Sequence, residues 1–229
     1  MGQWTTLKSH DGFALPAWQA APDAPARGAI VVLQEIFGVN AHIRAIVERL
    51  AARGWWAIAP ATFERVRPGV DLGYGASDVG VGMALKAQIE QLPAPGVMAD
   101  IQAAIDHAAS ASGPKVGIVG FCWGGLLAWR AAALCSGLSA AAPYYGGGMT
   151  SAAEIARQPR VPVLAHFGRR DKHIPLSGVQ QLAAAHPEAE VHLYDADHGF
   201  NCDMRASYDE ASAVRARDRT LAFFDRHLR

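Results

Sequence analysis

Residues 117–129 read GIVGFCWGGLLAW, and the order of residue types in this stretch predicts a sharp turn from a strand into a helix. An apolar run ends at Phe121, Cys122 follows it, and Gly124 opens a helical pattern. Residues 120–124 therefore have the form G-x-nucleophile-x-G, in which the flanking glycines leave room for a tight turn. Such a turn exposes a side chain at a helix N-terminus, where unpaired N–H groups stabilise an anion. The alternative is that Cys122 is a small buried hydrophobic residue, as most free cysteines are.

Strand and helix patterns alternate on both sides of this turn. Around Asp11-Gly12, residues 4–20 predict an N-terminal β-hairpin. Further strands are predicted over 28–36, 55–60, 115–121, 138–146, 161–168 and 189–196, and helices over 42–54, 83–92, 96–110, 124–135, 151–157, 176–185 and 206–228, with a loop over 61–82. This alternation predicts an α/β fold with a mostly parallel sheet and helices on both faces. Because no linker interrupts the chain, we expect one domain over residues 1–229.

Composition narrows the possible partners and location. Of the 229 residues, 51% are hydrophobic and 18% charged, and 21 basic residues balance 21 acidic ones. We therefore expect a globular protein without a nucleic-acid or membrane partner. No apolar run approaches the ~20 residues of a membrane span, and the first ten residues lack the apolar core of a signal peptide. Three cysteines argue against a disulfide scaffold, so we expect a cytoplasmic protein, and we expect it to be a monomer.

Ligands of parallel α/β sheets bind at the carboxyl ends of the strands, which selects one histidine among nine as the candidate base. His198 directly follows the strand predicted over 189–196. His166 and His192 lie inside strand patterns and are expected to be structural. His42 and His173 lie in plausible loops but fit poorly with the chain order of a nucleophile, an acid and a base.

An acid is needed to orient that base. Asp171 follows the strand that ends at Gly168, whereas Asp195 and Asp197 are too near His198 in sequence to reach its far ring nitrogen. The order Cys122, Asp171, His198 is the chain order of nucleophile, acid and histidine in α/β-hydrolases. The spacing of the histidines predicts no metal site, because no H-x-x-x-H pair occurs, and GFCWGG does not match a dinucleotide-binding loop. We expect no cofactor.

Five short segments together resemble the dienelactone hydrolase (carboxymethylenebutenolidase) family, which has the α/β-hydrolase fold. They are QEIFGV at 34–39, GFCWGG at 120–125, YYG at 144–146, GRRDKHIP at 168–175 and DHGF at 197–200. The resemblance implies that Cys122 is the nucleophile, His198 the base and Asp171 its orienting acid. It also implies that Glu35 contacts the resting thiol and moves when substrate binds. A carboxylate beside a thiol opposes its ionisation and can accept its proton. A salt bridge or helix cap is the alternative role of Glu35.

The resemblance also implies an oxyanion hole and a substrate pocket. The oxyanion hole would consist of the backbone N–H groups of Ile36 and Trp123. An apolar pocket would be lined by aromatic side chains, namely Phe37, Trp123, Tyr144, Tyr145 and Phe200, with core packing as the alternative for each.

The arginines depart from the family pattern. Well-characterised members hold a substrate carboxylate with two arginines, one after the fourth strand and one four residues past the catalytic histidine. Residues 71–88 contain no arginine, and Cys202 stands four residues past His198; Arg65, Arg67 and Arg205 are the nearest in sequence. This departure favours a neutral lactone or ester over an anionic dienelactone. The expected function is a cysteine-dependent lactone or ester hydrolase; alternatives are other acyl transfer, thioester or carbon–halogen hydrolysis, or a ligand-binding relative without turnover.

Overall fold

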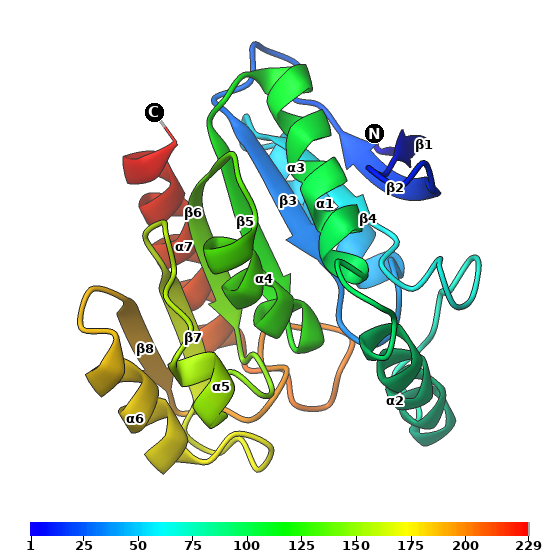
Figure 1. The fold of residues 1–229 in the computed structure, drawn as a ribbon. Coiled ribbons are helices and arrows are strands. Elements are labelled where there is room, and N and C mark those ends of the chain that lie inside the picture. Colours follow the sequence, from blue (N-terminus) through cyan, green and yellow to red (C-terminus); the bar gives the residue numbers. More distant parts are fainter. Residues whose placement is uncertain (229) are drawn as a thin grey trace.

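A computed structural model describes residues 1–228, and its strands form one eight-stranded sheet in the order β1-β2-β4-β3-β5-β6-β7-β8 (Figure 1). The strands are β1 (Gln3–Lys8), β2 (Ala14–Ala20), β3 (Ala29–Leu33), β4 (Trp56–Pro60), β5 (Val116–Phe121), β6 (Leu138–Tyr144), β7 (Leu164–Gly168) and β8 (Glu190–Tyr194). Strands β1 and β2 form an antiparallel hairpin, and β2 also pairs antiparallel with β4. All the other neighbouring strands, from β4 and β3 to β7 and β8, pair in parallel. The predicted α/β-hydrolase fold, with its N-terminal hairpin and mostly parallel sheet, is confirmed.

Helices cover both faces of this sheet (Figure 1). They are α1 (Ala41–Ala51), α2 (Ala76–Glu90), α3 (Val97–Ser112), α4 (Trp123–Leu134), α5 (Ala152–Ile155), α6 (Leu176–Ala185) and α7 (Glu210–His227). Helices α3 and α4 contact each other on one face, whereas α1 and α7 lie on the opposite face. Because both faces are covered, every residue of β3, β4 and β5 is buried, which explains their nearly continuous apolar sequence. No helix among residues 1–228 is long and apolar enough to cross a membrane.

The predicted loop over 61–82 was wrong at its C-terminal end, because α2 begins at Ala76 instead of residue 83. The Gly75 N–H donates to the Asp78 carboxylate at 3.2 Å, which stabilises the first turn. Gly80 and Gly82 obscured the helical pattern. Gly82 has a packing role, since a Cβ there would collide with the backbone of Ile36. The close approach of α2 to Ile36 places this helix beside the predicted catalytic loops.

The remaining element boundaries differ by a few residues. Helix α7 begins at Glu210 instead of residue 206, and its N-cap Asp209 accepts a hydrogen bond from the Ser212 N–H at 2.8 Å. Helix α5 has four residues, fewer than the predicted 151–157. The segment between β8 and α7 therefore runs as irregular backbone from Asp195 to Asp209, and it carries His198, Cys202 and Arg205.

Candidate active site

Cys122 lies between β5 and α4 in a left-handed backbone conformation that residues other than glycine rarely adopt. Its φ is 54° and its ψ is −117°. This strain, of order 1–3 kcal/mol, is typical of functional turns. The Cys122 N–H donates to the Tyr144 carbonyl at 3.1 Å, and the Cys122 carbonyl accepts from Gly125 at 2.9 Å. A Cβ at Gly120 would collide with the Gly124 carbonyl, so the flanking glycines are needed for the turn.

His198 and Asp171 come from the loops after β8 and β7 and form a buried pair. His198 Nδ1 lies 2.7 Å from Asp171 Oδ2, while Asp171 Oδ1 accepts the His173 N–H at 2.8 Å. The alternative acids are used elsewhere: Asp197 accepts the backbone N–H of His198 at 2.7 Å, and Asp195 is exposed beside Arg170. Two acceptor contacts fix the Asp171 carboxylate, and that carboxylate fixes the imidazole orientation.

Cys122 faces the other side of this imidazole. Burial opposes protonation of His198, but the charge of a Cys122 thiolate and the hydrogen bonds to Asp171 and Cys122 raise the pKa of His198 to about 10. The imidazole is therefore protonated at neutral pH when it faces a thiolate. The arrangement can hold a thiolate–imidazolium pair, with a nucleophile and a proton donor side by side.

Glu35 is buried in the loop after β3, where it bonds to two side chains. Arg205 Nη1 donates to Glu35 Oε1 at 3.0 Å, and the Tyr74 hydroxyl donates to Oε2 at 3.2 Å. The expected alternative role, a salt bridge at a strand end, is thus present in this structure. Burial opposes the charge of Arg205, yet the charges of Glu35 and Cys122 raise its pKa overall.

The backbone N–H groups of Ile36 and Trp123 donate to no acceptor within residues 1–228. Trp123 is held firmly, because its ring stacks on Phe63 at 4.8 Å and its Nε1–H donates to Glu90 at 3.1 Å. Fixed, unpaired donors of this kind are what an oxyanion hole requires.

A cavity of about 480 Å³ opens in front of Cys122 and His198. Its volume suits a small organic ligand. The lining residues are Ile36, Phe37, Val79, Met83, Lys86, Glu90, Cys122, Trp123, Leu126, Arg130, Gly147, Gly148, Ser151, His173, His198 and Arg205. Phe37 and Trp123 are thus two of the predicted aromatic residues that line this cavity.

The positions of the other three aromatic residues do not match the predicted pocket. Tyr144 points to the opposite side of the sheet, where it borders a cavity of about 70 Å³ and its hydroxyl lies 2.6 Å from Thr220 Oγ1. Tyr145 and Phe200 are fully buried and pack on each other with ring centroids 5.2 Å apart. Side chains alternate along a strand, so an apolar residue at a strand end faces the core as readily as the cavity.

Sequence reasoning missed the contribution of α2. Val79, Met83, Lys86 and Glu90 project into the cavity from one face of this helix, at spacings of four, three and four residues. Spacings of this kind are the helical signal, and they begin inside the segment that was predicted as a loop. His173 fits the predicted chain order poorly, yet the centroid of its ring lies 5.2 Å from that of His198 and the residue lines the cavity.

Only one of the three nearest arginines reaches the cavity. Arg65 is bound by Asp100 and Asp11, each at 2.7 Å, and Arg67 is exposed on the surface; neither lines the cavity. Arg205 does, from seven residues past His198. The irregular segment before α7 brings it back over the site.

A sequence model of the dienelactone hydrolase family matches residues 15–228. The chain belongs to this family. The carboxymethylenebutenolidase of Pseudomonas putida is 31% identical over 224 residues, which cover 95% of this chain and 94% of that protein. A candidate carboxymethylenebutenolidase of Salmonella typhimurium is 38% identical over 234 residues, covering 93% and 83% of the two chains.

A crystal structure of a candidate dienelactone hydrolase from Klebsiella pneumoniae is also similar. It matches with a TM-score of 0.83 at 35% identity and covers 98% of both chains. Family members act on small-molecule esters or lactones, and this chain is a hydrolase of that class of bond.

Proposed function

We propose that the chain is a cysteine-dependent lactone or ester hydrolase that works through a thioester intermediate on Cys122. The observation that carries the proposal is the position of His198, which lies 2.7 Å from Asp171 and faces Cys122 at the wall of a ligand-sized cavity. A nucleophile, a base and an orienting acid in this geometry are the parts that acyl transfer requires.

The proposed reaction has two steps. The Cys122 thiolate attacks the substrate carbonyl, and the N–H groups of Ile36 and Trp123 stabilise the oxyanion that forms. His198 gives its proton to the leaving alkoxide as the C–O bond breaks, which leaves a thioester on Cys122. Water then attacks the thioester while neutral His198 takes its proton, and the thiolate leaves as the acid product forms.

We further propose that Arg205 binds a carboxylate on the substrate. In the free protein this guanidinium bonds to Glu35 at 3.0 Å, and it also lines the cavity. A carboxylate in the cavity would compete with Glu35 for Arg205, and Glu35 would then be free to move relative to Cys122. This proposal reverses the preference for a neutral substrate, because Arg205 lies at the site although its sequence position departs from the family pattern.

The variant Arg205→Gln tests the substrate class. Its kinetics are compared with those of wild type on a dienelactone, an uncharged saturated lactone and p-nitrophenyl acetate. A charged hydrogen bond contributes about 1.5–3 kcal/mol, so KM for the dienelactone should rise about 10–100-fold. The two neutral substrates should change less than about threefold, and Arg67→Gln, at an exposed site outside the cavity, is the matched control. An equal loss on all three substrates would contradict carboxylate binding by Arg205.

The domain organisation, location and oligomeric state of the protein are also proposals. We propose that residues 1–229 act as one catalytic domain, as a cytoplasmic monomer whose partner is the small-molecule substrate, without nucleic acid or membrane. Size-exclusion chromatography with light scattering tests the monomer directly.

A further inference from the structure

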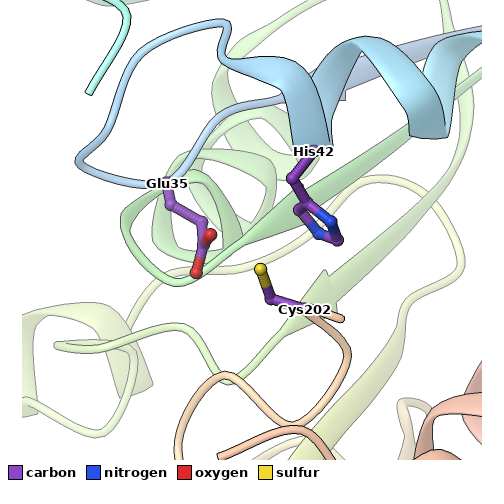
Figure 2. A group of neighbouring side chains, drawn as sticks. All are labelled: Glu35, His42 and Cys202. Atoms are coloured by element: carbon purple, nitrogen blue, oxygen red, sulfur yellow. The ribbon is translucent and has the colours of Figure 1, made fainter. Parts of the chain in front are cut away.

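A second group of reactive side chains lies beside the active site, formed by Glu35, His42 and Cys202 (Figure 2). One ligand atom from each lies within 4.8 Å of the other two, and all three side chains are buried. Within residues 1–228, no other group of three or more His, Cys, Asp or Glu side chains has this arrangement. Glu35 comes from the loop after β3, His42 from the first turn of α1 and Cys202 from the segment before α7.

The orientation of His42 is the observation that points to a ligand. Its Nδ1 lies 3.0 Å from Asp203 Oδ1, so the ring donates its N–H to this carboxylate and carries a lone pair on Nε2. Within residues 1–228, Nε2 has no hydrogen-bond partner, although His42 is only 1% exposed, and the ring points toward Cys202 (Figure 2). Histidines that bind metals nearly always donate the other ring N–H to a carboxylate or carbonyl, as His42 does here.

We propose that Glu35, His42 and Cys202 bind a divalent cation of the zinc class, with Asp203 orienting His42. One sulfur, one nitrogen and one oxygen form a donor set that suits Zn²⁺, whereas Mg²⁺ and Ca²⁺ prefer oxygen alone. Ligands 2.0–2.3 Å from a tetrahedral zinc stand about 3.3–3.8 Å apart, so ligand atoms that now lie up to 4.8 Å apart must approach one another by up to about 1.5 Å. Three protein ligands leave the fourth position to water.

Binding converts the Cys202 thiol into a thiolate ligand. The S–H bond breaks as the S–Zn bond forms, and the proton leaves to solvent. His42 releases no proton, because the ring N–H lies on Nδ1 against Asp203 and Nε2 already holds a lone pair. The thiolate therefore supplies the new negative charge of the site.

The surrounding charges permit a cation despite the nearby guanidinium of Arg205. Arg205 and Tyr74 each use one oxygen of Glu35, and a carboxylate has about four lone pairs, so the group can accept a further bond. The charges of the Cys202 thiolate and of Glu35 offset that of Arg205, while Asp203 pairs with Arg49 at 3.4 Å. Asp203 is half-exposed, so this edge of the cluster borders solvent.

The site goes beyond the proposed hydrolase activity and does not depend on Cys122 acting as a nucleophile. Its test uses the full chain carrying Cys122→Ser, since zinc can also bind a catalytic thiolate. Co²⁺ is titrated into the metal-free protein, a thiolate-to-cobalt charge-transfer band reports sulfur coordination, and Zn²⁺ then displaces the Co²⁺. Cys202→Ser and His42→Asn each remove one ligand, and the asparagine keeps a donor for Asp203. Cys135→Ser, at another buried cysteine, is the matched control.

We expect one equivalent of Co²⁺ with the band in wild type, Cys122→Ser and Cys122→Ser/Cys135→Ser. Loss of a ligand should weaken Zn²⁺ binding by more than about 100-fold, and Asp203→Asn should weaken it about 10–100-fold as the loss of an orienting partner. Absence of a band in the folded Cys122→Ser protein would overturn the proposal. So would a band that is lost with Cys122 and retained in the single Cys202→Ser variant, because the cation would then lie at the catalytic thiol. Thermal unfolding of each variant verifies that it is folded.

Discussion

Cys122 and Cys202 both lie in loops beyond the carboxyl ends of the sheet, and they differ in almost everything that decides the chemistry of a thiol. Cys122 is partly exposed at the N-terminus of α4, on a strained backbone, and faces His198. Cys202 is fully buried beside Glu35, and burial together with this carboxylate raises the pKa of its thiol to about 11. The two thiols thus lie in different chemical environments, because the backbone strain and the neighbouring charges differ.

The largest expected effect separates Cys122 from the remaining cysteines in catalysis. Cys122→Ala should lower kcat on p-nitrophenyl acetate by at least about 10⁴-fold, since loss of a nucleophile removes the whole acyl-transfer route. Cys135→Ala, at a buried position at the C-terminal end of α4, should remain within about threefold of wild type. Steady-state kinetics on the two purified variants measure this difference. Equal activity of Cys122→Ala and wild type would remove Cys122 from the reaction.

Alkylation by iodoacetamide at pH 7.5 should sharpen the contrast between the thiols. Cys202 and Cys135 have pKa values raised by burial to about 11 and about 12, so less than about one thiol in 10³ is ionised in either. Cys122 should therefore be labelled at least about 100-fold faster in the folded protein. Peptide mapping by mass spectrometry gives the rates, with urea-unfolded protein as the control in which all three sites react. Comparable labelling of Cys202 in the folded protein would contradict its buried state.

The pH dependence of stability tests the pair formed by Cys122 and His198. The pKa of His198 is raised to about 10 in the folded protein from a value near 6.5 in the unfolded chain, so the folded protein binds the imidazole proton more tightly. This contribution to the free energy of unfolding is complete below about pH 6.5 and is lost as the pH rises through about 10. Removing the thiolate charge with Cys122→Ala should reduce that loss. Urea unfolding midpoints at pH 6.5, 8 and 9.5 measure this loss in both proteins. An equal fall of the midpoint with pH in wild type and Cys122→Ala would contradict the interaction between Cys122 and His198.

The smallest effect concerns Tyr145, whose hydroxyl lies close enough to both thiols to interact with them electrostatically. Its hydroxyl is buried and has no hydrogen-bond partner in the described part of the chain, and the centroid of its ring lies 5.2 Å from that of His198. Removing an unsatisfied hydroxyl should leave stability unchanged or raise it by up to about 1 kcal/mol. For Tyr145→Phe we expect such a result in urea unfolding and a kcat within about threefold of wild type. A tenfold loss of kcat would instead place the hydroxyl in contact with the substrate, as the sequence had suggested.

Periodicity and turn chemistry predicted the fold well where the signals are local. The buried run of β5, the glycines around Cys122 and the turn at Asp11-Gly12 each specify a local conformation, and the structure has a strand, a sharp turn and a hairpin there. The helix predicted from residue 83 was too short, because Gly80 and Gly82 weaken the helical propensity of the first half of α2. The need for glycine at position 82 arises from its contact with Ile36, which lies 46 residues earlier in the chain.

The sequence by itself determined the class of the sheet, the strained turn at Cys122 and the candidates Asp171 and His198. These features depend on strand ends and glycine spacing, which can be recognised from residues close together in the sequence. Only the tertiary structure decided that Arg205 reaches the cavity, that Tyr144 faces away from it and that Cys202 meets His42 and Glu35. Those outcomes depend on the path of the irregular segment before α7 and on which face of the sheet a side chain points to. Both are set by packing between residues far apart in the chain, and no local pattern encodes them.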